Sequence, residues 1–440
     1  MLYLGKFRQI YTKNKGETAM LIEFSVANFK SIKDRQTLSM VASKNREEAH
    51  VHVFNPGSSA GGDDIKLLPA AVVYGANAAG KSNLLQAFHV MTIIIMESAS
   101  EKHRGDTFPV TPFMLDSATQ NLPSEFEVFF VVDGVRYQYG FAATRQRVME
   151  EWLRAYPNKR SQRWFSRMWD KKGKKYDWFF GSSFSGEKNL WKKSTRDNAL
   201  FLSTAVQLNS RQLQPVYDWF RNTVRIAGIG GFDGAFSASL CETDHKQEVL
   251  DYLRVADLDI EDIQVKKTPV QFPKDMPPDL KQALARNIAN RETYDIRTTH
   301  RSASGKPVVF DFDEESHGTQ KFFSLTGPWI ASLKRGRVLF IDELHNSMHP
   351  DIIEFLVQMF NDKKTNPNHA QLVFTTHETS IMDQKFLRRD QFWFCEKDSS
   401  QATRVYPLTD FRPRKGRGNL RLAYLSGSYG AVPNIRMAHG

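Results

Sequence analysis

The eight residues from Gly75 to Ser82 constrain this chain more than any other part of it. They read Gly75-Ala76-Asn77-Ala78-Ala79-Gly80-Lys81-Ser82 and match the pattern G-x-x-x-x-G-K-[ST]. The apolar run Leu68–Tyr74 predicts a buried strand before them, and Asn83–Phe88 predicts the start of a helix after them. Glycine lets the backbone turn its N–H groups towards a phosphate, and a helix N-terminus favours the same anion. The pattern therefore predicts a nucleotide-binding loop in an α/β domain.

Every residue of this loop is a candidate nucleotide ligand. Lys81 would reach the β- and γ-phosphates, and the Ser82 hydroxyl would bind Mg²⁺. The backbone around the phosphates would come from Gly75, Ala76, Asn77, Ala78, Ala79, Gly80 and the first helical residues through Asn83. A chance match in a glycine-containing turn is the alternative, and the strand before and helix after the loop argue against it. The expected cofactors are ATP and Mg²⁺.

Length and composition limit what surrounds this loop. A chain of 440 residues is long enough for two or three domains, or for one large α/β domain with an insertion. Its only two cysteines, Cys241 and Cys395, cannot form a disulfide framework and fit a reducing cytoplasm. No run of 18 apolar residues is present, so we expect no membrane span. Residues 1–19 are polar and basic, and we expect a disordered extension there.

Basic charge is concentrated in one segment. Between Thr144 and Lys193 fourteen Lys and Arg residues stand against five Asp and Glu residues, which accounts for +9 of the chain's net +11. Five of the eight tryptophans lie in the same segment. Such a surface suits nucleic acid. A β-rich insertion whose tryptophans form its own core is equally compatible, and for Lys171–Lys175 we favour a solvated hairpin turn.

Alternating apolar residues predict several hairpins. Leu21–Phe29 and Asp34–Met40 form the first, and the runs on either side of Asp133-Gly134 form a second. Tyr294–His300 and Val308–Phe312 predict another pair of strands. From these patterns we expect a first lobe at residues 20–147, a basic, aromatic-rich insertion or lid at 148–300, and a second lobe at 301–440.

The second lobe holds the residues that would complete the nucleotide site. Arg337–Glu343 is an apolar strand ending in two acids, and we expect it beside the strand that precedes the phosphate-binding loop. Asp342 would hold Mg²⁺ and Glu343 would polarise the attacking water. Leu372–His377 predicts another strand, whose terminal His377 would sense the γ-phosphate. Upstream, Ser316 and Gly318 open a helix and form a candidate anion site, which alone could equally be a helix cap.

These four elements, in this order, resemble the ATPase heads of the ABC type, including those of SMC-like proteins and RecF. The resemblance implies a P-loop NTPase fold, with a mixed sheet, flanking helices and a β-rich, partly helical insertion. It also implies that two heads pair head-to-tail, with Ser316 and Gly318 of one copy contacting the γ-phosphate held by the other. Lys81, Glu343 and His377 would then carry the catalytic roles, as ligand, general base and switch histidine. His317 and Thr319 depart from the usual signature segment, Leu-Ser-Gly-Gly-Gln.

Further motifs narrow the resemblance. They are Phe24–Ile32, Glu150–Leu153, Thr195–Ser203, Asp342–Pro350 and Tyr424–Pro433. Together they resemble the AAA15-type subgroup of bacterial ABC-like ATPases, which includes RloA and abortive-infection ATPases and is related to the ATPase half of OLD proteins. The subgroup implies antiphage defence beside a separate effector, often a nuclease. The chain ends about 40 residues after Asp398, which is too short for the nuclease domain of OLD proteins, so we expect no nuclease activity from it.

Other functions remain open at this point. A DNA-repair or recombination head of RecF type would bind DNA directly through the basic insertion. A transporter motor subunit would need a surface for membrane helices, and a structural scaffold with a dead ATP site would not need Lys81, Asp342 and Glu343.

Overall fold

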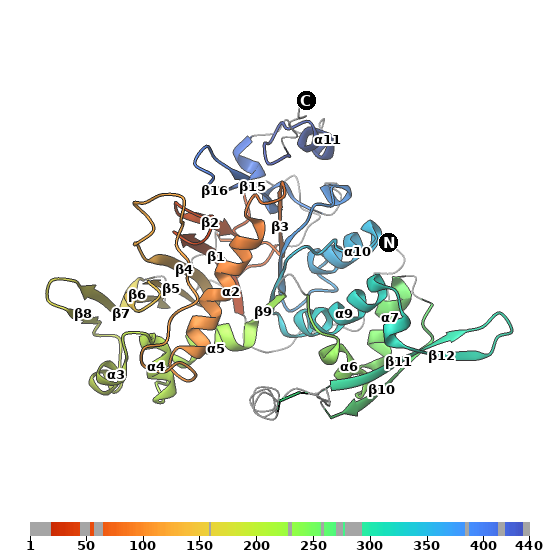
Figure 1. Cartoon of the computed structure of the whole chain (residues 1–440), viewed down its shortest axis with the longest axis horizontal. Coiled ribbons are helices and arrows are strands. Elements are labelled where there is room, and N and C mark those ends of the chain that lie inside the picture. The colour runs from red at the N-terminus through yellow and green to blue at the C-terminus, as the bar shows by residue number, and fades with distance from the viewer. Residues whose placement is uncertain are drawn as a thin grey trace. The chain divides into compact units, whose positions relative to one another are not determined.

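The computed structural model describes residues 19–44, 53–56, 65–157, 160–227, 231–256, 259–269, 276–277, 293–382, 387–411 and 419–433. They fall into two compact units (Figure 1). Unit 1 contains Met1–Ile229, Ser332–Asn346 and Ile353–Gly440, and unit 2 contains Gly230–Ala331 and Ser347–Ile352. Each unit is described by itself below. The expected extension at residues 1–19 lies outside the described residues, except for Ala19.

An antiparallel sheet of seven strands forms one layer of unit 1, in the order β2-β1-β4-β5-β6-β7-β8. The strands are β1 (Ala19–Ala27), β2 (Gln36–Ser39), β4 (Ser124–Val132), β5 (Val135–Ala143), β6 (Val148–Tyr156), β7 (Gln162–Asp170) and β8 (Lys175–Phe180). The two predicted hairpins within it are confirmed. Asp133 and Gly134 both have positive φ, as a tight two-residue β-turn requires.

The second sheet of unit 1 has six strands in the order β16-β15-β3-β14-β13-β9. They are β3 (Ala70–Gly75), β9 (Val224–Ala227), β13 (Val338–Ile341), β14 (Gln371–Thr375), β15 (Phe392–Lys397) and β16 (Thr403–Pro407). All neighbours are parallel except β15 and β16. Our expectation that the strand ending in Asp342 lies beside the loop strand β3 is wrong, because β14 pairs with both and lies between them.

Helix α2 (Lys81–Glu97) follows the loop and contacts strands of both sheets. Phe88 meets Phe24 of β1 edge-on, with ring centroids 4.8 Å apart, and stacks on Phe340 of β13 at 4.4 Å. One apolar core is therefore continuous from the antiparallel sheet through α2 to the parallel sheet. This packing fixes the N-terminal end of α2 relative to the edge where the parallel strands end.

Shorter helices complete unit 1. They are α3 (Lys188–Ser194), α4 (Phe201–Gln207), α5 (Gln214–Asp218), the π-helical turn η2 (Trp219–Thr223), η4 (Ser380–Met382), η5 (Arg389–Gln391), η6 (Leu408–Phe411) and α11 (Leu420–Leu425), together with most of α10 (Pro350–Asn361). Among the described residues, no helix is both long and apolar enough to cross a membrane.

Unit 2 contains a three-stranded antiparallel sheet, β10-β11-β12, with bounds Asp262–Thr268, Thr293–Arg301 and Pro307–Asp311. The predicted pairing of the last two strands is confirmed. Its helices are α6 (Ala235–Cys241), α7 (Lys246–Val255), the turn η3 (Phe312–Glu314) and the larger part of α9 (His317–Arg335). Gly327 lets α9 approach α6 closely, since a Cβ there would lie 2.8 Å from the Ser237 backbone.

The segment expected to be the first part of a separate insertion continues the large sheet instead. β6 pairs with β5 along its whole length, and β7 and β8 extend the same sheet. Leu153 and Phe165 on the inner face join the main core of unit 1. The compact units therefore have boundaries that differ from the expected domains. Lys171–Lys174 form the turn between β7 and β8, as expected for a solvated lysine turn.

Candidate nucleotide site

The loop between β3 and α2 has the geometry of a phosphate cradle. Gly75 is required because a Cβ there would lie 2.4 Å from the carbonyl oxygen of Cys395 on β15. Gly80 has a φ of +107°, and a Cβ there would meet the Thr403 hydroxyl at 2.1 Å. The first turn of α2 has no acidic residue, and Gly80 offers no side-chain cap. Its N-terminal N–H groups are therefore suited to an anion.

A small set of side chains supports this loop from outside. The Thr403 hydroxyl donates to the Ala79 carbonyl at 2.9 Å and lies 2.8 Å from the Ser31 hydroxyl. The Asn83 side-chain amide donates to Ser31 Oγ at 2.7 Å. Asn83, which we placed among the nucleotide ligands, thus has its side chain engaged in holding the loop. Ser31 and Thr403 were not foreseen, since a lone serine and a threonine near a strand start carry no distinctive sequence signal.

Lys81 lies folded over the loop and is largely buried. Its ammonium donates to the carbonyls of Gly75 at 2.8 Å and Ala76 at 3.1 Å, and lies 3.1 Å from His377 Nε2. Burial lowers the Lys81 pKa, and the nearby Asp342 and Glu343 carboxylates partly oppose that shift. An ammonium has three donors and no acceptor, so His377 Nε2 accepts from Lys81. The His377 ring is then neutral and carries its proton on Nδ1.

The surroundings of His377 agree with this neutral form. Burial lowers the His377 pKa, and the neighbouring Lys81 and His345 side chains add to the shift. The His345 ring meets the His377 ring edge-on at 5.4 Å, and its Nδ1 accepts the His377 backbone N–H at 3.4 Å. In this arrangement Nε2 accepts, so a role as donor to a phosphate requires its proton to move from Nδ1 or a second proton to bind. His345 is a further neighbour that sequence reasoning missed.

Asp342 and Glu343 follow β13 and share one partner on β14. The buried Thr375 hydroxyl donates to Asp342 Oδ1 at 2.6 Å and accepts the Glu343 backbone N–H at 2.8 Å. Glu343 has a φ of +53°, which is an unfavourable backbone conformation for any residue other than glycine. Such conformations are often found at functional sites. One threonine therefore orients both acids. Because β3, β14 and β13 are parallel, all these groups meet at one edge of the sheet.

Ser316 and Gly318 belong to unit 2, whereas the residues above belong to unit 1. Ser316 Oγ accepts the Thr319 N–H at 3.1 Å and lies 2.8 Å from the Thr319 hydroxyl, so it caps helix α9. A Cβ on Gly318 would lie 2.7 Å from the Ser347 carbonyl oxygen, which explains the glycine. Unit 1 alone thus brings together Lys81, Asp342, Glu343 and His377, whereas Ser316 and Gly318 are part of unit 2.

The residues of unit 1 fit a nucleotide with a divalent cation. Uncapped N–H groups and the Lys81 ammonium suit phosphate oxygens. The Ser82 hydroxyl and the Asp342 carboxylate are the oxygen ligands that Mg²⁺ prefers. Glu343 lies next to Asp342 at the same strand end, where it could accept a proton from water. The arrangement can therefore bind a nucleoside triphosphate and position a water molecule against it.

Comparison with known proteins finds one family model and several solved structures that are similar to this chain. Residues 70–383 match the model of a family described as "AAA domain, putative AbiEii toxin, Type IV TA system". No curated protein matches the chain. Among solved structures, the SMC head domain from Thermotoga maritima is similar, with 11% identity and a TM-score of 0.35, over 88% of this chain and 98% of that one. A Pyrococcus furiosus Smc head domain with an extended coiled coil, bound to the C-terminal domain of ScpA, shows 11% identity and a TM-score of 0.36, over 89% and 97%.

Proposed function

Because this chain belongs to the family described as "AAA domain, putative AbiEii toxin, Type IV TA system", we propose that it is a Mg²⁺-dependent ATPase whose ATP-driven, head-to-tail pairing controls a separate effector in bacterial antiphage defence. The predicted fold class, an ABC-type P-loop ATPase head, is confirmed, and the chain carries a P-loop ATPase domain. The assignment to the AAA15 type with RloA belongs to the proposal. The observation that carries the ATPase proposal is the position of Lys81. Its ammonium lies 3.1 Å from His377 Nε2, and the Asp342 and Glu343 carboxylates act to raise its pKa.

Each residue has one task in the proposed reaction. Ser82 and Asp342 would hold Mg²⁺, and the bound ATP would be the source of the phosphoryl group. Lys81 would exchange its carbonyl partners for phosphate oxygens and neutralise their charge. Glu343 would polarise the attacking water, in an orientation fixed by its backbone N–H bond to Thr375. His377, released by Lys81, would respond to the γ-phosphate once Nε2 carries a proton.

Pairing would complete the site. We assign the contact between copies to Ser316 and Gly318 at the N-terminus of α9. In one copy these residues would contact the γ-phosphate of the ATP that is bound by the second copy. The Ser316 hydroxyl is at present engaged as the cap of α9, and it could donate its own proton to phosphate while still accepting from Thr319. If two copies pair only around bound ATP, binding and hydrolysis of ATP would control dimer formation. An effector could then recognise the dimer.

Two substitutions test the ATPase. Lys81→Ala removes the phosphate ligand and should abolish ATP binding in calorimetry. Glu343→Gln keeps the hydrogen-bonding shape but removes the base, so it should bind ATP, hydrolyse it at least about 100-fold more slowly, and remain paired in light scattering. Glu101→Gln changes an exposed glutamate outside the site and is the matched control. Normal hydrolysis by the Glu343→Gln protein would refute the assignment of the base.

Defence needs its own test. Cells that express this chain together with the product of its neighbouring gene should show a lower phage plating efficiency. The same pair should not lower it when this chain carries Lys81→Ala. A neighbouring gene that encodes a membrane permease would overturn the effector proposal. The purified chain should leave DNA uncut, since we expect the nuclease activity in the effector.

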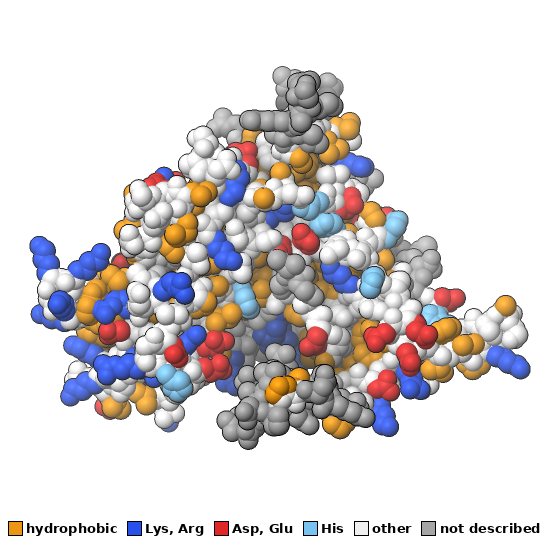
Figure 2. Space-filling view, viewed as in Figure 1, with side chains coloured by type: hydrophobic (Ala, Val, Ile, Leu, Met, Phe, Trp, Pro, Cys, Tyr) orange, Lys and Arg blue, Asp and Glu red, His pale blue; other side chains and the backbone are white. Residues whose placement is uncertain are grey.

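A second candidate function is direct DNA binding of RecF type. It is favoured by the lysines and arginines that gather around the β7–β8 end of unit 1 (Figure 2). It predicts salt-dependent binding of duplex DNA that is lost when the lysines between Thr144 and Lys193 are neutralised. Duplex binding that survives this change would rule out that surface.

A further inference from the structure

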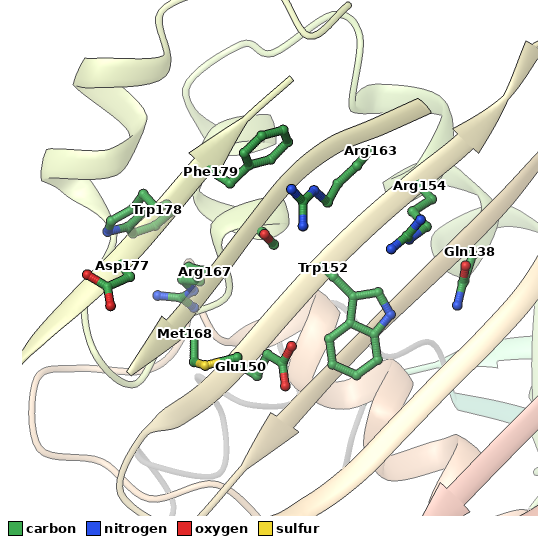
Figure 3. Close-up of a pocket in the computed structure, with 11 residues that line it drawn as sticks. Gln138, Glu150, Trp152, Arg154, Arg163, Arg167, Met168, Asp177, Trp178 and Phe179 are labelled. Atoms are coloured by element: carbon green, nitrogen blue, oxygen red, sulfur yellow. The ribbon is translucent and has the colours of Figure 1, made fainter. Parts of the chain in front are cut away.

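A pocket lies on the open face of the antiparallel sheet, on strands β5 to β8 of unit 1 (Figure 3). Its volume is about 470 Å³, within the usual range for small-molecule sites. The opposite face of the same strands carries Leu153 and Phe165 in the core. Of the residues that line the pocket, Arg167 and Trp178 lie on that core side and the others point away from it. None of them belongs to the nucleotide site.

The floor of the pocket is aromatic. Trp152 and Phe179 lie on the open face, in one register row with Gly140 and Ser166. A Cβ on Gly140 would lie 2.4 Å from the Trp152 ring, so the indole lies flat against the sheet where a side chain would stand. Its Nε1–H donates to Glu127 Oε1 at 2.9 Å, which fixes the ring. The small Ser166 leaves room between the two aromatic rings.

One end of the pocket is cationic. Arg163 lies with its guanidinium 3.7 Å from the centre of the Phe179 ring, and Arg154 extends from β6 on the same side (Figure 3). Within the part of the chain that the structure describes, neither guanidinium pairs with a carboxylate. The pocket's third arginine, Arg167, is fully buried and bonded to Glu151, so it is not available to a ligand. Two planar cations therefore lie open beside an aromatic surface.

The other end is acidic. Glu150 and Asp177 lie beside Met168, on the side of Trp152 away from Arg154 (Figure 3). Burial raises the Glu150 pKa, and the neighbouring Glu125 adds to the shift. The two carboxyl groups provide hydrogen-bond acceptors for hydroxyl or amino groups. They would repel a uniformly anionic ligand, and the arginines would disfavour a purely apolar one.

We propose that this pocket binds a nucleoside phosphate. The phosphate would lie on Arg154 and Arg163, which offer bidentate donors. The base would lie against Trp152 and Phe179, and its amino groups or the sugar hydroxyls would reach Glu150 and Asp177. The site is separate from the ATP site and does not depend on the proposed ATPase. The ligand can be a free nucleotide or one nucleotide of a single strand, which present the same chemistry.

Binding is measured with Lys81→Ala protein, so that the ATP site does not contribute. The probes are the four ribonucleoside monophosphates and single-stranded DNA and RNA of twelve nucleotides, in calorimetry. We expect binding that becomes at least about tenfold weaker in the double variant Arg154→Gln/Arg163→Gln, because two charge-assisted contacts are lost. The matched control is Lys174→Gln/Lys175→Gln, which removes the same charge at the exposed end of the β7–β8 turn and the exposed first residue of β8, and should change affinity less than about threefold.

The outcomes separate the sources and decide the proposal. Arginine-dependent binding of monophosphates identifies a free nucleotide as the ligand, and binding of the oligonucleotides alone identifies a single strand. Absence of binding by every probe, or an equal loss in both double variants, overturns the proposal, because it indicates no site or only general charge attraction. In an otherwise unchanged chain, Arg154→Gln/Arg163→Gln should hydrolyse ATP normally, so failure here is distinct from failure of the ATPase proposal.

Discussion

The nucleotide site depends on a threonine that carries no charge. Thr375 Oγ1 donates to Asp342 and accepts from the Glu343 backbone, so one hydroxyl orients the Mg²⁺ ligand and the general base. Groups that orient ligands and bases are often as important to a site as the groups themselves. The neighbouring Thr376 is equally buried, but its hydroxyl accepts from the Glu378 backbone N–H and bonds neither Asp342 nor Glu343.

Thr375→Val should therefore lower kcat for ATP by roughly 10- to 100-fold. It keeps the shape of the side chain but leaves the Asp342 oxygen and the Glu343 N–H without their partner. Steady-state ATPase assays and thermal unfolding check this. Thr376→Val is the control, and it should lose a similar amount of stability, about 1–3 kcal/mol, while keeping kcat within about threefold. Equal losses of kcat in both variants would show that Thr375 acts only through stability.

For single residues, the sequence predicts the charged groups of the site better than the uncharged residues that orient them. Lys81, Asp342 and Glu343 were found because a fixed spacing or a strand end singles them out. Thr375 and Thr403 were not, because a threonine in or beside a strand is ordinary and its role arises only from neighbouring strands. The pairing of His377 with Lys81 also depends on β14 lying between β3 and β13, which no local pattern reveals.

At the scale of elements, a buried carboxylate joins the antiparallel sheet to helix α4. Glu151 on β6 accepts from Arg167 on β7 and from Tyr139 on β5. It also accepts the backbone N–H groups of Phe201 and Leu202 at 2.7 and 3.0 Å, at the start of α4. Two motifs that marked the resemblance, around Glu151 and around Phe201, therefore meet in space as one structural joint.

Glu151→Gln should lower the free energy of unfolding by about 3–5 kcal/mol, because Arg167 would keep a buried charge without its counter-ion. Urea unfolding followed by circular dichroism measures it. Glu150→Gln lies one residue earlier on the open face of β6 and should change stability by less than about 0.5 kcal/mol. Similar unfolding midpoints for the two variants would show that Arg167 finds another partner or solvent.

Alternation predicted most strands, because a two-residue period is a local property. The β4–β5 hairpin and the β11–β12 pair are examples. The continuation of the sheet through β6 to β8 was missed, because its lysines and tryptophans suggested a separate insertion. Only the burial of alternate residues such as Leu153 and Phe165 in the shared core shows that these strands belong to unit 1.

At the scale of the whole molecule, the proposed ATP site is divided between two copies. Unit 1 holds Lys81, Asp342, Glu343 and His377, and unit 2 holds Ser316 and Gly318. A site completed by a second copy makes ATP binding and assembly one equilibrium. That equilibrium requires residues of unit 1 in one copy to act together with residues of unit 2 in the other.

Mixing two inactive proteins tests whether the site is shared between copies. Lys81→Ala and Ser316→Ala should each have little ATPase activity alone, because both sites of each homodimer lack a residue. In a mixed dimer one site regains Lys81 from one copy and Ser316 from the other, so activity should reappear, at roughly a quarter of the unmodified rate in an equal mixture. Activity that stays at the level of the separate proteins, with mixed dimers shown by mass spectrometry, would show that Ser316 does not complete the site of a second copy.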